Sequence, residues 1–225
     1  MTSQPTHVMI FSHGFGVERD ARGMFTDIAA AFPVAENVLF DYNIPNRTEN
    51  TLTVRALSEQ KDILLTEVAR VKEQFPDVTI DIIAHSLGCI TAALALPEDI
   101  RKAIFLAPPL EMKSTSLERF TGRPGSVIDP NGLSRLARHD GSFTLVPATF
   151  WKEREAIDPI ALFNAFSEAT ELTVILAKQD DVVSAERKSL LSPRIRVFGI
   201  DGDHDFRFKN RAGLLQELQW LIHSF

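Results

Sequence analysis

The 225-residue chain has a single cysteine, Cys89, which excludes an intramolecular disulfide framework. A chain without disulfides fits a reducing compartment. No window approaches the roughly 18 consecutive apolar residues that a membrane span requires. The first residues lack the basic segment and the long apolar core of a signal peptide. We therefore expect a soluble, cytoplasmic protein.

Positive charge is also scarce, since the formal net charge is −6 at pH 7. No cluster of Lys and Arg is dense enough to follow a phosphate backbone, so nucleic acid is not an expected partner. The hydrophobic fraction of 44% and the charged fraction of 24% are those of an ordinary globular protein. The length suits one domain with a substantial core. It predicts no particular oligomeric state.

Short apolar segments alternate with helix-length segments along the chain. A long amphipathic helix is expected over 55–75, where apolar residues recur near a period of 3.6 and Pro76 follows. Strands that are apolar throughout and separated by helices are typical of a parallel sheet covered on both faces. The pattern predicts an α/β fold with a mostly parallel sheet of about six strands and helices on both faces. The expected strands are 7–11, 37–43, 78–85, 103–107, 172–177 and 194–200.

One connection, residues 111–171, is far longer than the roughly 2–6 residues usual for loops in α/β folds. Turn signals indicate a β-hairpin within 126–147, and an Asp-Pro pair indicates a helix over 158–166. We therefore predict a core made of residues 1–110 and 172–225, with residues 111–171 inserted as a cap.

The stretch IIAHSLGCI places Ser86 between an expected strand and an expected helix. Ala84 and Gly88 stand two residues before and after it. Only small residues fit beside a sharp strand-to-helix turn that strains the serine backbone. Alone, the stretch is equally consistent with a polar residue in an ordinary turn. It resembles the nucleophile elbow of the α/β-hydrolase superfamily, G-x-S-x-G, with alanine in the first glycine position.

A second match to this family is SHGFG, which directly follows the first expected strand. The resemblance implies that the backbone N–H of Phe15 is one oxyanion donor and that of Leu87, after the serine, is the other. Small residues are needed here because a side chain would block the backbone from the carbonyl oxygen. The alternative is a plain glycine-rich turn in which His13 only forms local hydrogen bonds.

The third match is LAKQDDVVS, after the expected strand 172–177. The family typically carries an aspartate here, followed by an apolar pair, and the register assigns Asp180 as the acid. Asp181 is the competitor, one residue later. Some family members carry the acid after the preceding strand, which makes Glu111 a third candidate.

The fourth match is GIDGDHDFRF, where His204 follows the last expected strand as the family histidine does. Alternating aspartates at 201–205 suggest a calcium loop instead. The EF-hand pattern then needs Gly at the sixth position and Glu at the twelfth, where this chain has Phe206 and Ala212. The remaining alternative is an acidic, solvated loop.

Ser86, Asp180 and His204 occur in the order of the α/β-hydrolase triad. The resemblance covers nearly the whole chain except the insertion. It implies a serine hydrolase that cleaves carboxylic esters of small to medium acyl chains through an acyl-enzyme, without a cofactor or a metal. The expected partner is a small-molecule ester or other acyl substrate. Alternatives are a thioesterase or other acyl-transfer enzyme and a non-catalytic ligand-binding member of the fold.

Further residues are candidates for the substrate pocket. His85 precedes the nucleophile and is expected to shape the pocket floor, and His13 lies in the oxyanion turn. The aromatic pair Phe150 and Trp151 is expected to face the site from the cap. A metal site of His13, Asp41 and His85 is conceivable at the strand ends but is not our prediction.

Overall fold

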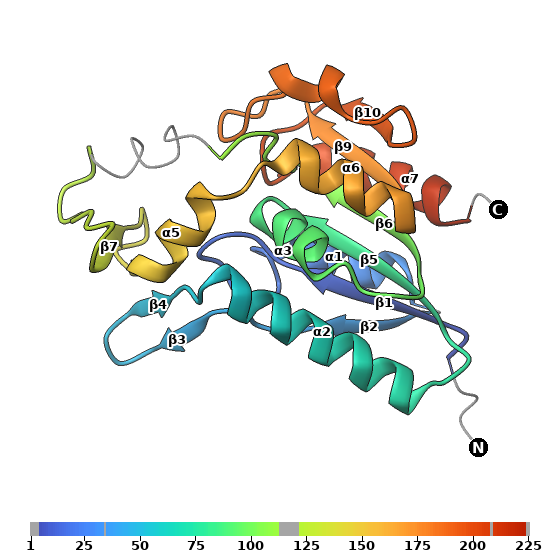
Figure 1. The fold of residues 1–225 in the computed structure, drawn as a ribbon, viewed down its shortest axis with the longest axis horizontal. Helices are drawn as coiled ribbons and strands as arrows, with labels where there is room; N and C mark the ends of the chain where they lie inside the picture. The colour runs from blue at the N-terminus through green and yellow to red at the C-terminus, as the bar shows by residue number, and fades with distance from the viewer. Residues whose placement is uncertain (1–4, 34, 113–121, 208, 224–225) are drawn as a thin grey trace.

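The computed structural model describes residues 5–33, 35–112, 122–207 and 209–223 (Figure 1). Its main sheet has six parallel strands in the order β10-β9-β6-β5-β1-β2, which confirms the predicted α/β fold. Each lies where a strand was expected. The bounds are β1 His7–Ser12, β2 Glu36–Leu39, β5 Thr79–His85, β6 Ile100–Leu106, β9 Glu171–Ala177 and β10 Arg196–Ile200.

Helices cover both faces of this sheet (Figure 1). On β1, Val8 and Ile10 point into the core formed with α2 and α3, while Met9 and Phe11 point into the core formed with α1 and α7. Successive strand side chains point to opposite faces, so a strand buried on both sides is apolar throughout. The bounds are α1 Met24–Ala31, α2 Leu57–Gln74, α3 Leu87–Ala95, the 3-10 helix η1 Glu186–Leu190 and α7 Lys209–His223. Within the described residues, no helix has the length and apolar character needed to cross a membrane.

A second, smaller sheet lies beside the main one and has the strand order β3-β4-β8-β7. The expected hairpin within 126–147 is present as the antiparallel pair of β7 and β8. The hairpin of β3 and β4 was not predicted, and β4 pairs in parallel with β8. Two distant segments of the chain therefore build this sheet. The bounds are β3 Ile44–Asn46, β4 Thr51–Thr53, β7 Leu133–Ala137 and β8 Phe143–Pro147.

The described part of the segment 111–171 also contains two helices, α5 Ala148–Glu155 and α6 Pro159–Ala169. The expected helix over 158–166 corresponds to α6, and the Asp158 carboxylate caps its first turn. Phe163 and Phe166 of α6 stack on Phe105 of the main sheet, at ring distances of 5.3 and 5.4 Å. This helix thus belongs to the layer that covers the main sheet. The boundaries drawn between core and cap stay a prediction.

Candidate active site

Ser86 occupies the sharp turn between β5 and α3 that the sequence predicts. Its φ of 55° and ψ of −124° lie in a region that costs a residue other than glycine about 1–3 kcal/mol. A Cβ atom at Gly88 would lie 2.0 Å from the carbonyl oxygen of Ser12, so only glycine fits there. A Cβ at Gly14 would lie 3.1 Å from the Cβ of Ser86. Close packing of the loop after β1 against the turn at Ser86 explains the glycines at positions 14 and 88.

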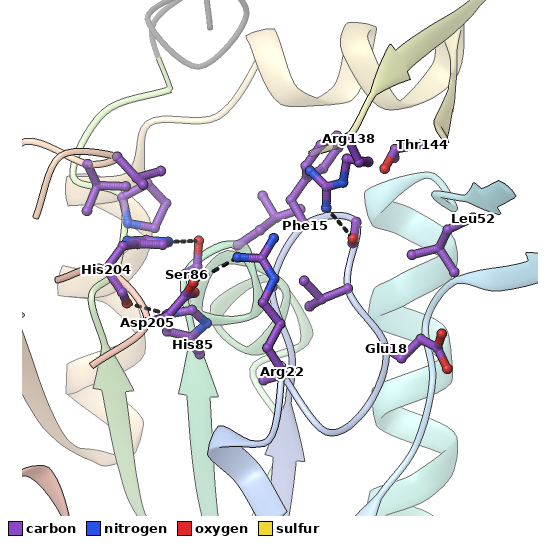
Figure 2. A pocket seen from close by; sticks show the side chains of 18 of the residues that line it. Phe15, Glu18, Arg22, Leu52, His85, Ser86, Arg138, Thr144, His204 and Asp205 are labelled. Atoms are coloured by element: carbon purple, nitrogen blue, oxygen red, sulfur yellow. Dashed lines mark hydrogen bonds and ion pairs between the residues drawn. The ribbon is translucent and has the colours of Figure 1, made fainter. Parts of the chain in front are cut away.

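A chain of hydrogen bonds connects Asp180, His204 and Ser86. Nδ1 of His204 is 2.8 Å from the Asp180 carboxylate. Nε2 of His204 is 2.9 Å from Oγ of Ser86 (Figure 2). Because a carboxylate only accepts, Nδ1 carries the proton, and Nε2 of the neutral ring accepts from the serine hydroxyl. The other oxygen of Asp180 accepts from the backbone N–H groups of Val182 and Val183, at 2.8 and 3.0 Å. The acid is therefore fixed in position by its own loop.

The structure separates the three candidates for the acid. Asp180 makes the hydrogen bond with His204. Asp181 and Glu111 lie on the wall of the adjoining cavity. Among these residues, the register argument selected the carboxylate that reaches the histidine.

His85 lies beneath the candidate base. It is 4% exposed, and its Nε2 donates to the carbonyl oxygen of His204 at 2.9 Å. Burial, together with the nearby charge of His204, lowers the pKa of His85 to about 3, so its ring stays neutral. A neutral ring that donates to the backbone of His204 holds the base in place without repelling its positive form.

Phe15 and Leu87, the expected oxyanion donors, line the same cavity as Ser86. Leu87 is the first residue of α3, and a backbone N–H in the first helical turn has no acceptor within the helix. The ring of Phe15 packs against Phe150 with a centroid distance of 5.4 Å. The loop after β1 is therefore held between the serine and helix α5.

His13 supports this loop from inside the protein. Its Nε2 accepts from the backbone N–H of Tyr42 at 2.9 Å, and its Nδ1 donates to the carbonyl oxygen of Gly14 at 3.0 Å. Burial lowers the pKa of His13, so the neutral ring can make both bonds. His13 is not among the residues that line the cavity, in contrast to its expected place in the pocket.

A cavity of about 900 Å³ opens over Ser86. Loops that follow β1, β5, β6, β9 and β10 contribute to its wall, as do β8, α5 and the turn before β8. His85, Phe150 and Trp151, all expected in the pocket, are among its lining residues. The indole N–H of Trp151 donates to Oγ of Ser134 at 2.9 Å, which fixes the ring from behind.

The arginines on this wall could not be predicted from the sequence. They come from separate segments, and no spacing relates them. Arg22 is the middle one of three consecutive residues with positive φ, at 48°, 59° and 84°. Glycine at the third position is the only local signal of this turn. The arginines that line the cavity are Arg22, Arg123, Arg138, Arg154 and Arg207.

In the described part of the chain, no group of three or more His, Cys, Asp or Glu side chains is arranged to hold a metal ion. Asp41 instead accepts a hydrogen bond from the backbone N–H of Arg19 at 2.7 Å.

No protein-family model matches the chain, and no curated protein matches it by sequence. Solved structures match over nearly the full length. Est1E from Butyrivibrio proteoclasticus, solved with ferulic acid bound, is 16% identical with a TM-score of 0.68; the match covers 97% of this chain and 90% of that one. A metagenome-derived lipolytic enzyme is 14% identical with a TM-score of 0.69, over 98% and 94% of the two chains.

The monoacylglycerol lipase of Paleococcus ferrophilus is 15% identical with a TM-score of 0.61, and the match covers 95% of this chain and 93% of that one. Identities this low carry information about the fold rather than the reaction. The sheet order, the helices on both faces and these full-length matches lead to one conclusion: the chain has the α/β-hydrolase fold.

Proposed function

We propose that the protein is a serine hydrolase that cleaves carboxylic esters of small to medium acyl chains. The observation that carries this proposal is the hydrogen-bonded series of Asp180, His204 and Ser86, which ends at a cavity. A serine hydroxyl is a weak nucleophile until an adjacent base can take its proton and a third group orients that base. The site has a group for each of these roles.

In this mechanism, Oγ of Ser86 attacks the carbonyl carbon of the ester while Nε2 of His204 takes the hydroxyl proton. Asp180 keeps the ring oriented and stabilises its positive form. The N–H groups of Phe15 and Leu87 bind the oxyanion that develops. His204 then gives the proton to the leaving alcohol, and a water molecule activated by the same histidine releases the acid from Ser86.

The cavity supports the size and the polarity of the substrate. Its volume of about 900 Å³ lies within the roughly 300–1,000 Å³ common for small-molecule pockets. The rings of Phe15, Phe150 and Trp151 on its wall favour an acyl or alcohol group with apolar character. Proteins of similar fold include an esterase, a lipolytic enzyme and a monoacylglycerol lipase, and ester chemistry in those proteins agrees with this proposal.

Two features favour catalysis over ligand binding alone. The strained backbone of Ser86 persists only because the surrounding structure holds it, and such strain clusters at sites where geometry serves chemistry. His204 is also within hydrogen-bonding distance of both Ser86 and Asp180. A protein that only binds a ligand in the pocket needs neither feature.

Labelling with a fluorophosphonate probe tests this proposal. The folded protein should be labelled at Ser86, as located by peptide mass spectrometry, whereas heat-denatured protein and the Ser86→Ala variant should not. A folded wild-type protein that stays unlabelled would contradict it. Comparing p-nitrophenyl esters of graded chain length with matched acyl thioesters then separates an esterase from a thioesterase.

A further inference from the structure

Beyond the ester bond itself, we propose that the substrate carries a carboxylate and that Arg22 and Arg138 bind it on the side of the cavity formed by the smaller sheet. This inference rests on the proposed hydrolase function and names the class of ester. The two guanidinium groups lie on the wall of the cavity that Ser86 and His204 also line.

Arg22 is turned toward the nucleophile by an unusual backbone. Ala21, Arg22 and Gly23 all have positive φ, which residues other than glycine rarely adopt. Nη1 of Arg22 is 2.8 Å from the carboxylate of Asp205, the residue directly after His204. Figure 2 shows its side chain extending from the loop toward the space between Ser86 and Arg138. Backbone strain thus holds a cation beside the reacting groups.

Arg138 faces the same space from the turn between β7 and β8. One of its Nη atoms donates to the carbonyl oxygen of Gly16, in the loop that carries the expected oxyanion donor (Figure 2). Burial and the positive charges of Arg22 and Arg123 lower the pKa of Arg138 to about 10, so it is still charged at neutral pH. Like charges held together in a partly buried site are stabilised by an anion between them.

Both guanidinium groups and carboxylates lie near Arg138. The largest charge effects on it come from the guanidinium groups of Arg22 and Arg123 and from the carboxylates of Asp140 and Asp205. A carboxylate on the substrate would bring one negative charge to these guanidinium groups, whereas a phosphate monoester would add about two negative charges to a wall that already holds carboxylates.

Four more acidic side chains line the cavity, namely Glu18, Asp20, Glu111 and Asp181. Glu18 accepts from Arg47 at 2.6 Å, and Asp20 accepts from the backbone N–H of Arg22 at 3.2 Å. Both Glu18 and Asp20 therefore have partners other than the guanidinium groups of Arg22 and Arg138.

A buried hydroxyl marks the same wall. Thr144 is almost fully buried, and its Oγ1 has no hydrogen-bond partner among the described residues. A Cβ built on Gly16 would lie 2.9 Å from Nη2 of Arg138 and 3.1 Å from Oγ1 of Thr144. The guanidinium group and the hydroxyl therefore both lie beside this glycine. A buried polar atom without a partner calls for an explanation, and a ligand oxygen bound beside Arg138 provides one. Planar guanidinium groups match a carboxylate in geometry as well as in charge.

Paired substrates that differ only in the charge test the inference. For a carboxylate on the acyl side, the pair is mono-p-nitrophenyl glutarate and its methyl-capped diester. For a carboxylate on the alcohol side, the pair is p-acetoxybenzoate and its methyl ester. In one of the two pairs, kcat/KM should be about tenfold or more higher for the carboxylate form, as expected for hydrogen bonds to a charged group.

Variants assign this preference to the arginines. Arg138→Met and Arg22→Met should each lower the ratio of the two kcat/KM values about tenfold, and Arg138→Lys should retain part of it. Thr144→Val should lower the ratio less. Arg70→Met, on the exposed side of α2, is the matched control and should leave the ratio unchanged. If Arg138→Met does not fold, the Arg22 and Arg138→Lys variants still decide the question.

The two proposals fail in distinguishable ways. If the wild type hydrolyses neither member of any pair and the fluorophosphonate does not label Ser86, the proposed function is wrong. If Ser86 is labelled and esters are cleaved, but the neutral form is preferred in both pairs, the carboxylate inference alone is wrong. An anionic preference that Arg22→Met and Arg138→Met leave unchanged would also overturn it.

Discussion

Two aspartate–histidine pairs are associated with strand β5, and the distance between carboxylate and imidazole is nearly the same in both. At the turn after the strand, Ser86 meets His204, which is bonded to Asp180 at 2.8 Å. Five residues earlier on the same strand, Asp81 is bonded to His7 at 2.9 Å. Only the first pair lies at the cavity. The distance between carboxylate and imidazole therefore does not distinguish a catalytic pair from a structural one.

What distinguishes the pairs is the surroundings of the carboxylate. Asp81 is 1% exposed and is also bound through both oxygens by the guanidinium of Arg101. Burial alone would raise the pKa of Asp81, but the hydrogen bonds from His7 and Arg101 outweigh it and lower that pKa. Asp180 instead accepts from backbone N–H groups, which position it without a compensating cation. Its negative charge remains available to stabilise a positive imidazole ring.

The largest effect should come from the acid beside the nucleophile. We expect Asp180→Asn to lower kcat for an ester substrate about 10⁴-fold, because the amide favours the wrong histidine tautomer. Asp181→Asn is the matched control and should change kcat by less than about tenfold, because Asp181 lacks this role. Steady-state kinetics on a p-nitrophenyl ester measures both. The opposite ranking would assign the acid to Asp181.

The next largest effect should fall on stability and not on activity. We expect Asp81→Asn to lower the free energy of unfolding by about 1.5–3 kcal/mol, because Arg101 and His7 would lose a charged hydrogen-bond partner while Arg101 stays partly exposed to water. Urea denaturation at neutral pH measures this loss. The kcat of the folded variant should remain within a few-fold of the wild type. A loss of kcat as large as that of Asp180→Asn would show that the pair of Asp81 and His7 is not purely structural.

The pH dependence of stability provides a control for this variant. The folded-state pKa of Asp81 is lowered, so the stability it contributes is fully present above the unfolded-state pKa. This contribution is lost as the pH falls through the lower folded-state pKa. The difference in unfolding free energy between the wild type and Asp81→Asn should therefore shrink in acid. A difference that stays constant from neutral pH into acid would contradict the assignment of the pKa shift.

The smallest effect concerns the strain at the nucleophile. We expect Ser86→Gly to be about 1 kcal/mol more stable than Ser86→Ala, because glycine adopts a φ of 55° without the Cβ penalty. Both variants lack the hydroxyl, so the comparison isolates the backbone. Thermal unfolding of the two proteins is the measurement. Equal stabilities would show that the turn is not strained in the way its dihedral angles indicate.

The four inner strands of the main sheet, β1, β5, β6 and β9, could be predicted from the sequence because they are buried on both faces and are therefore mostly apolar. The turn around Ser86 could be predicted because close backbone contacts require glycine at position 88. Strands β3 and β4 could not, since each has three residues and β4 pairs with β8, about ninety residues later. The arginines of the cavity gave no signal for the same reason, because tertiary structure alone brings them together.

The smaller sheet has a consequence for protein engineering. Its strands come from residues 44–53 and 133–147, and β4 and β8 form the seam between the two hairpins. Removing residues 111–171 as a block would leave an exposed edge on β4 and would also strip α6 from the main sheet. A transplant of substrate specificity between proteins of this fold would have to exchange both hairpins together.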